Sequence, residues 1–208
     1  MLIALLSPAL SKMRESARSL QCMNNLRQIT LASTTYAQEH DGLFFMQYHI
    51  WAVASKEWHL KLYETGYLKD FRVCICPSHP PKEYSQGNKY YVYGLRDYRA
   101  ADSNYVRDAG SCYNGNTFLQ LYGLTDPSNY YLFADSSYGS GRENNQCYLL
   151  QSTPDTNVGG VQTRHVDLAN VSFADGHVES CNQMRLKSVG FSGGLDKKTR
   201  LVIRVYLE

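Results

Sequence analysis

The chain has 208 residues, of which 43% are hydrophobic and 19% charged, with a formal net charge of +2 at neutral pH. This near-balance, without any long run of like charges, excludes the strongly basic surface that is typical of nucleic-acid-binding proteins. The length fits one large domain or a domain with an appendage. Tyrosine is abundant, at 17 residues, which favours β-rich structure with half-exposed aromatic faces.

The first forty residues predict one long amphipathic helix, from Pro8 to about Glu39. Charged residues form a polar face, and apolar residues recur every three or four positions. Pro8 either starts the helix in its first turn or kinks a helix that begins earlier, and Asp41-Gly42 ends it. A single helix of this length needs a coiled-coil partner, a sheet or a membrane to pack against. The apolar positions are Leu6, Leu10, Met13, Ala17, Leu20, Cys22, Leu26, Ile29 and Tyr36, and the polar face consists of Lys12, Arg14, Glu15, Arg18 and Arg27.

After Gly42 the pattern changes to short apolar runs separated by Gly, Asn, Ser, Asp and Pro, which predicts antiparallel strands. One helical segment is expected at 51–67, and residues 100–123 and 136–164 are expected to be long loops. The fold class is therefore α+β, with a long N-terminal helix (1–40) packed on an antiparallel β-sheet head (41–208). The expected strands are Phe44–Tyr48, Phe71–Ile75, Tyr90–Gly94, Tyr130–Ala134, Asn170–Ala174, His177–Cys181 and Leu201–Leu207.

The stretch "NVSFADGHVES" predicts a β-hairpin. Val171, Phe173 and Val178 alternate with polar residues, and Asp175-Gly176 lies between the two runs. Asp-Gly readily adopts the positive φ angles of a two-residue type I′ turn. Asp175 and Gly176 are therefore assigned to a structural turn, and His177 to the solvent face of the second strand.

The same region holds a candidate metal site made of His165, Asp175 and Asp135. Carboxylates and a histidine suit a divalent cation, but the three residues lack any compact ligand spacing. A metal-dependent hydrolase built on these residues is one hypothesis. The alternative, which we favour, is that His165 orders its loop by hydrogen bonding and that no cofactor is bound.

The six cysteines, an even number, favour disulfide bonds in an exported protein. "CICPSH" also offers Cys74, Cys76 and His79 as zinc ligands. A single-residue spacer would point the two thiols to opposite faces of a strand, so disulfides to separate partners are the preferred interpretation. The candidate disulfide cysteines are Cys22, Cys74, Cys76, Cys112, Cys147 and Cys181.

Two motifs of known catalytic sites are missing from the sequence. It contains no H-E-x-x-H helix and no glycine-rich phosphate loop. We therefore expect the protein not to be an enzyme.

Both ends of the chain resemble the type IV pilin-like pseudopilins, specifically the H-X9-DG group with a prepilin-type N-terminal helix. "LLSPALSKMRESARSLQCMNNLRQITLASTTYAQEHDG" is similar to the stretch that follows the hydrophobic anchor in that family. His165, nine residues and then Asp175-Gly176 match the signature that names the group. "FRVCICPSH", "YVYGL" and "DPSNYYLFADS" match further family segments, in the same order, so the resemblance covers most of residues 2–181.

The resemblance implies a non-enzymatic structural subunit of a type II secretion or type IV pilus-like assembly. Its partners would be other pilin-like subunits, contacted through the N-terminal helix. The full-length form would sit in the inner membrane with a periplasmic or extracellular head, and Pro8 fits the helix kink of the family. By analogy with the major pseudopilins, the resemblance also allows a structural calcium ion in the head.

The peptidase site of that family and the first half of its anchor do not occur in this sequence. Roughly a dozen more apolar residues before Met1 would restore a spanning length, so we expect an N-terminally truncated form. The alternative function is a periplasmic or surface module that uses its tyrosines to bind a glycan or a secreted client.

Overall fold

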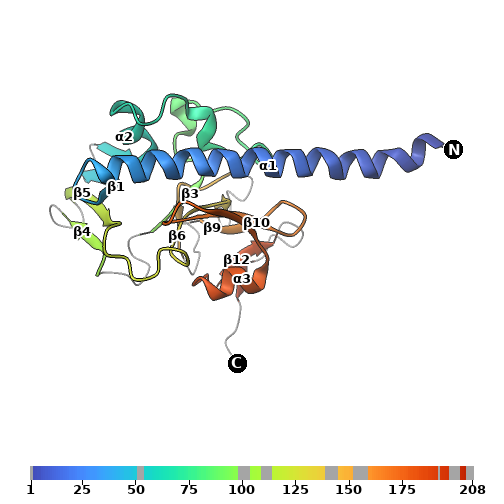
Figure 1. The fold of residues 1–208 in the computed structure, drawn as a ribbon. Coiled ribbons are helices and arrows are strands. Elements are labelled where there is room, and N and C mark those ends of the chain that lie inside the picture. The colour runs from blue at the N-terminus through green and yellow to red at the C-terminus, as the bar shows by residue number, and fades with distance from the viewer. Residues whose placement is uncertain are drawn as a thin grey trace.

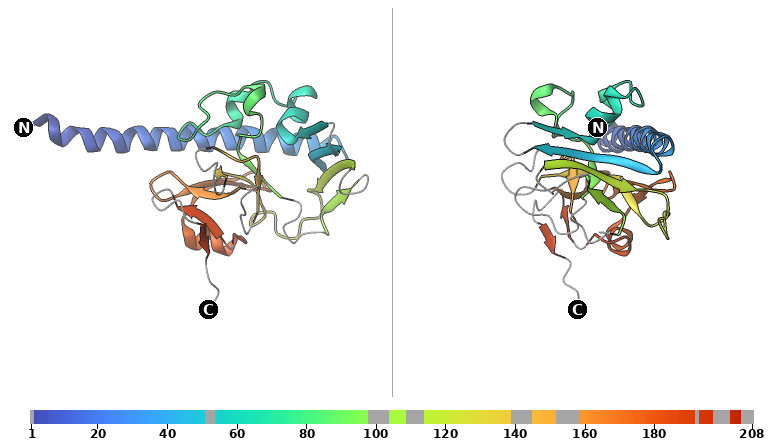
Figure 2. Two further views of the ribbon diagram at one scale, coloured as in Figure 1. Left: turned by 180° about the vertical axis from the view of Figure 1, so that it is seen from behind. Right: turned by 90° about the vertical axis from the view of Figure 1, so that its left-hand side faces the viewer.

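The computed structural model describes residues 2–50, 54–97, 104–108, 114–138, 145–151, 159–191, 193–196 and 202–204. The fold is α+β, as the sequence predicts: the long helix α1 (Leu2–Gln38) lies along a head of antiparallel and mixed β-sheets. Figure 1 shows that the N-terminal part of α1 projects beyond the head, whereas its C-terminal part packs across it. The left view of Figure 2 shows the same projection from behind, and the right view looks nearly along the helix.

Helix α1 begins at Leu2, so Pro8 lies inside the helix rather than in its first turn. The predicted end of the helix is confirmed: Asp41 and Gly42 have φ angles of 54° and 79°, and the Gly42 N–H donates to the Ala37 carbonyl. Positive φ at these two residues turns the chain directly into the first strand. Within the described residues, no helix combines the length and apolar character that a membrane crossing requires.

The apolar residues of α1 lie on two opposite faces, which differs from the single stripe that the sequence suggests. Cys22, Leu26 and Ile29 are buried against the head, whereas Leu10, Met13 and Leu20 are exposed. At about 100° per residue, the exposed set falls roughly 180° from the buried one. The head contacts only the inner face of the helix, from about Glu15 onward. Glu15, which the sequence placed on the polar face, is half-buried.

The described strands form three small sheets. The first is antiparallel, in the order β2 (Ala54–Glu57), β1 (Leu43–Ile50), β5 (Asn114–Gln120) and β4 (Val106–Asp108). The second has the order β11 (Val178–Cys181), β10 (Ala169–Phe173), β6 (Tyr131–Ala134), β3 (Gly94–Arg96) and β8 (Leu149–Leu150). The third has the order β13 (Val202–Arg204), β12 (Gly193–Asp196), β9 (Gly160–Thr163) and β7 (Ser136–Ser137). Pairs β3–β8 and β9–β12 are parallel.

Short helices complete the head: α2 (Trp58–Glu64), η1 (Phe71–Cys74), η2 (Gln86–Asn88) and α3 (Gln183–Ser188). The main core lies between α1, α2 and the first two sheets. Its centre is aromatic, with the Phe133 ring 4.7 Å from Trp58 and 6.0 Å from Phe44 between centroids. A second core, around Phe173 and Phe191, lies among β6, β10 and α3.

Two predicted strands and one predicted helix differ from the structure. Phe71–Cys74 is the 3₁₀ helix η1, because Asp70 caps it by accepting from the Arg72 N–H. The predicted strand Tyr90–Gly94 starts only at Gly94, and the predicted helix 51–67 covers only Trp58–Glu64, preceded by β2. Residues 51–53, and 201 and 205–207 of the last predicted strand, lie outside the described residues.

The two expected loops contain strands. Residues 114–120 form β5, the central partner of β1 and β4, although they are rich in Asn and Gly. Residues 136–164 contribute β7, β8 and β9. These strands form because their backbones complete ladders with distant segments, so the pairing rather than the local sequence determines them.

The predicted hairpin is confirmed, since β10 and β11 pair antiparallel with Ser172 opposite Val178. Its turn is not type I′, because only Gly176 has a positive φ, of 94°. The Gly176 N–H donates to the Phe173 carbonyl and the Phe173 N–H to the His177 carbonyl. The turn is thus a three-residue loop that ends on a left-handed glycine.

Gly94→Ala is expected to lower the free energy of unfolding by about 1–3 kcal/mol, measured by urea denaturation. A Cβ at Gly94 would lie 2.3 Å from Cγ of Leu150. Leu150 is fully buried, so it has no room to move away. Gly87→Ala is the control, because its nearest neighbour would be Ser85 Oγ at 3.8 Å. Equal stability of the two variants would contradict this prediction.

Candidate functional site

Four side chains with metal-binding chemistry meet beneath helix α1. Ligand atoms of Cys22, Cys76, Asp135 and His165 all lie within 4.8 Å of one another, and all four residues are buried. They come from separate parts of the chain: Cys22 from α1, Cys76 from the segment after η1, Asp135 from between β6 and β7, and His165 from the residues after β9. The fold thus brings together residues that are up to 143 positions apart in sequence.

The contacts within this cluster are short. His165 Nε2 lies 3.4 Å from Cys76 Sγ and 3.3 Å from Asp135 Oδ2. The Cys22 thiol donates to Asp135 Oδ1 over 3.3 Å. These side chains point toward one shared centre.

A shell of hydrogen bonds holds the cluster in place. His165 Nδ1 contacts Glu15 Oε1 at 2.8 Å, and the same oxygen accepts from the Ser78 hydroxyl at 2.7 Å. Asp135 Oδ2 accepts from the Asn170 N–H at 2.8 Å. The guanidinium of Arg164, almost fully buried, lies 4.0 Å from Asp135 Oδ1. Residues of α1 therefore take part both in the cluster and in its support.

The environment of the cluster shifts the pKa values of its four ligand residues, some up and some down. Burial opposes charge on Cys76, but hydrogen bonds with Cys22 and His165 lower its pKa to about 6. Burial likewise opposes charge on His165, yet Asp135 and Cys76 raise its pKa to about 10. Burial and the neighbouring Cys76 raise the pKa of Cys22. Against its burial, Arg164 and His165 keep the pKa of Asp135 below its usual value.

Tyr93 adds a polar atom beside the cluster. The residue is fully buried, and its hydroxyl lies beside the Cys22 thiol. Burial and the charges of Cys22, Cys76 and Asp135 raise the pKa of Tyr93.

The structure brings together two of the three residues that the sequence proposed as metal ligands. Asp135 and His165 belong to the cluster, but Asp175 lies in the β10–β11 turn. There it contacts the His177 ring at 2.5 Å and accepts from the His177 N–H at 3.1 Å. The Asp135–Asp175–His165 arrangement of the hydrolase hypothesis is therefore not formed.

His165 was expected to order its own loop. Backbone hydrogen bonds among Arg164, His165 and Leu168 close that loop, and Val166 and Asp167 have positive φ angles of 56° and 64°. The His165 ring points instead to Glu15 on α1 and to Asp135.

The expected disulfides are not formed in the described part of the chain. Its five cysteines, Cys22, Cys74, Cys76, Cys147 and Cys181, are buried free thiols, and Cys112 lies outside the described residues. Cys74 and Cys76 do diverge, as their spacing predicts. Cys74 packs in the main core while Cys76 enters the cluster, and His79 stays apart from it. The sequence did not group Cys22 and Cys76 with Asp135 and His165, because the distances between these residues in sequence carry no ligand-spacing signal.

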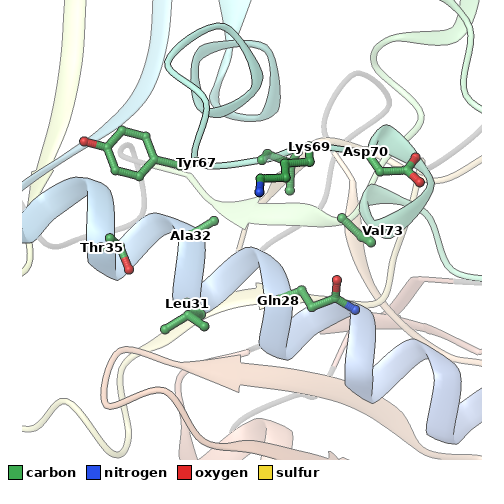
Figure 3. Close-up of a pocket in the computed structure, with 9 residues that line it drawn as sticks. Gln28, Leu31, Ala32, Thr35, Tyr67, Lys69, Asp70 and Val73 are labelled. Carbon is green, nitrogen blue, oxygen red and sulfur yellow. The ribbon is translucent and has the colours of Figure 1, made fainter.

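A second feature is a groove of about 460 Å³ beside the C-terminal half of α1. Figure 3 shows its two walls: one is the helix, and the other is the segment that leads into η1. Its helix wall belongs to the same exposed face as Leu10, Met13 and Leu20, at about 100° per residue. The lining residues are Gln28, Leu31, Ala32, Thr35, Tyr67, Leu68, Lys69, Asp70 and Val73.

The fold and these features define a protein with a partly projecting N-terminal helix on a β-rich head. A family model described as SBP_bac_10, protein of unknown function (DUF1559), matches residues 11–43, which make up most of α1 and the turn into β1. That family is associated with pilin-like proteins. No curated protein and no solved structure matches the chain.

Proposed function

We propose that the protein is a non-enzymatic, pilin-like structural subunit of a type II secretion or type IV pilus-like assembly, and that it contacts neighbouring subunits through helix α1. The observation that carries this proposal is the second apolar face of the helix. Leu10, Met13 and Leu20 are exposed on the side that the head does not cover. Large apolar side chains gathered on one exposed helix face are typical of interaction surfaces.

The position of this face fits contact between helices. It starts on the projecting part of α1 and continues to Leu31, which is 68% exposed and lines the groove. A neighbouring helix that packs along α1 would bury the exposed side chains and reach the groove at the end of the contact. In this proposal the head faces the periplasm or the cell exterior, and α1 supplies the assembly contact.

The alternative, a module that binds a glycan or a secreted client through its tyrosines, has less support. Among the described residues, Tyr63 and Tyr122 are the tyrosines whose rings are largely exposed. Many of the others pack in ring pairs, such as Tyr90 with Tyr148 and Tyr91 with Tyr138. The groove contains one tyrosine, Tyr67, whose hydroxyl donates to Glu39.

Photo-cross-linking in cells that produce the full-length protein tests the proposal. A photoreactive amino acid at Met13 or Leu20 is expected to yield covalent dimers of the chain, because both positions lie in the proposed contact. Leu20→Glu is expected to weaken the cross-link from position 13, since a carboxylate would have to lose its hydration in an apolar contact.

Met184 is the matched control, because it is also a large apolar residue, 81% exposed, but lies on α3 in the head. It is expected to give no dimer. Cross-links that form equally from position 184, or that fail to form from both helix positions, would refute the proposed role of α1.

A further inference from the structure

The buried cluster points to a metal ion, independently of the proposed role in an assembly. We propose that Cys22, Cys76, Asp135 and His165 form a structural zinc site that fastens helix α1 to the head. Zinc is bound by thiolate, imidazole and carboxylate, and structural sites use four such ligands. Calcium prefers oxygen ligands only, so two sulfur atoms and one nitrogen favour zinc over the calcium ion that the family resemblance allows.

The distances match a tetrahedral site. Zinc–ligand bonds of about 2.0–2.3 Å place neighbouring ligand atoms of a tetrahedron about 3.3–3.8 Å apart. Two pairs in the cluster are already at this spacing: Cys76 Sγ to His165 Nε2 at 3.4 Å and His165 Nε2 to Asp135 Oδ2 at 3.3 Å. Cys22 Sγ lies 3.3 Å from the other carboxylate oxygen, Asp135 Oδ1, and one ligand atom from each of the four residues lies within 4.8 Å of the others. A small inward movement of each side chain would complete the site.

The surroundings resemble the support that zinc ligands usually have. Glu15 contacts Nδ1 of His165 at 2.8 Å, which leaves Nε2 for the metal and fixes the orientation of the ring. Asp135 is held by the Asn170 N–H. The Tyr93 hydroxyl lies beside Cys22 and is placed to donate to the sulfur of that ligand.

The charges balance. Two thiolates and the carboxylate of Asp135 carry three negative charges, and one zinc ion together with the buried Arg164 carries three positive ones. Binding requires both thiols and Nε2 of His165 to be free of protons, and it leaves His165 neutral. All four ligands are buried, so no position is open to a substrate, which is typical of structural rather than catalytic zinc.

The location explains what the metal would do. Cys22 is the first fully buried apolar residue of α1 on its way into the head, and the other three ligands lie on the head itself. A single ion would therefore join the helix to three separate segments at the point where the helix leaves the head. Metal binding that requires the folded arrangement stabilises it.

The metal content of the purified chain is the direct test. The protein would be produced with zinc in the medium and purified through a tag without histidines and without chelators. We expect about one zinc ion per chain by mass spectrometry of the metal, and close to none in Cys22→Ala or Cys76→Ala. Cys74→Ala is the matched control, because Cys74 is an equally buried thiol two residues from Cys76, and it should keep its zinc.

Cobalt titration of the wild-type protein decides the matter even if the variants fail to fold. Metal-free protein, kept reduced, should develop the visible bands of tetrahedral cobalt and a thiolate charge-transfer band, and zinc should abolish both. A chelator should lower the midpoint of thermal unfolding by roughly 10 °C.

Three results would overturn the proposal. The first is a wild-type protein without zinc that gives no thiolate–cobalt band, which would leave a metal-free network of Cys76, His165 and Asp135. The second is a Cys22–Cys76 disulfide in non-reduced peptides. The third is full zinc content in both Cys22→Ala and Cys76→Ala.

Discussion

Asp135→Ala is expected to lower the free energy of unfolding of the metal-free protein by about 3–5 kcal/mol, measured by urea denaturation in the presence of a chelator. Asp135 is fully buried, and its carboxylate lies 4.0 Å from Arg164 and 3.3 Å from His165. Without it, the guanidinium keeps its charge in a site that excludes water, and the Asn170 N–H and the Cys22 thiol lose their acceptor. Asp135→Asn should lose less, because an amide oxygen can still accept from Asn170.

A double-mutant cycle with Arg164 shows whether the lost charge is the cause. Arg164→Met should destabilise the wild type strongly, since it leaves the Asp135 carboxylate buried with one cation fewer. In the Asp135→Ala background the same substitution should cost about 1–3 kcal/mol less. If the two costs are equal, the ion pair contributes nothing, and the effect of Asp135→Ala comes from its hydrogen bonds alone.

Asp135 also illustrates what the sequence can and cannot predict about the site. Residue type singled out Asp135 and His165, because carboxylates and a histidine suit a divalent cation. It also singled out Asp175, which the local physics of a tight turn explains completely. Cys22 was not predicted as a ligand, and Cys76 was considered only together with Cys74 and His79, because the spatial proximity of residues on a helix and in a distant loop depends on tertiary packing. One available signal was that the single residue between Cys74 and Cys76 sends their thiols in different directions.

Some features of the fold could likewise be predicted from local sequence, and others could not. Helix α1 and its end at Asp41-Gly42 were predictable, because periodicity and positive φ are local properties. The covered face was not, since Leu20 and Cys22 are both apolar and lie two residues apart, and only contact with the head distinguishes them. Strand β5 was taken for a loop because its Asn and Gly residues have low strand propensity, and its ladder with β1 outweighs that preference.

The two faces of α1 relate the proposed function to the proposed zinc site. The inner face of α1 carries Glu15, Ser19 and Cys22, whose polar side chains contact His165, Asn170 and Asp135. The outer face carries Leu10, Met13 and Leu20. In the proposed function, neighbouring subunits would contact the outer face, and the cluster would hold the inner face to the head near the point where the helix projects from it.

Acid sensitivity is the second large effect that we expect, and His59 makes a large contribution to it. His59 is fully buried in α2 among the rings of Trp58, Phe71 and Tyr84. Burial, and to a smaller extent the charge of Lys89, lowers its pKa to about 3. In the unfolded chain His59 therefore binds a proton near pH 6.5, whereas in the folded protein it stays neutral down to about pH 3. His59 should not affect the free energy of unfolding well above pH 6.5, and it should lower that free energy by about 2.5 kcal/mol between pH 7 and pH 4.5.

The measurement is urea denaturation at several pH values within this window, with a chelator present so that loss of metal does not add to the slope. His59→Leu should flatten the profile, because leucine has a similar volume and no proton to take up, and because Nδ1 of His59 has no hydrogen-bond partner in the described structure. Leu62→Ala, a buried control in the same helix, should lower stability by about 2–5 kcal/mol at every pH and leave the slope unchanged. A slope that is unchanged in His59→Leu would assign the acid sensitivity to another group.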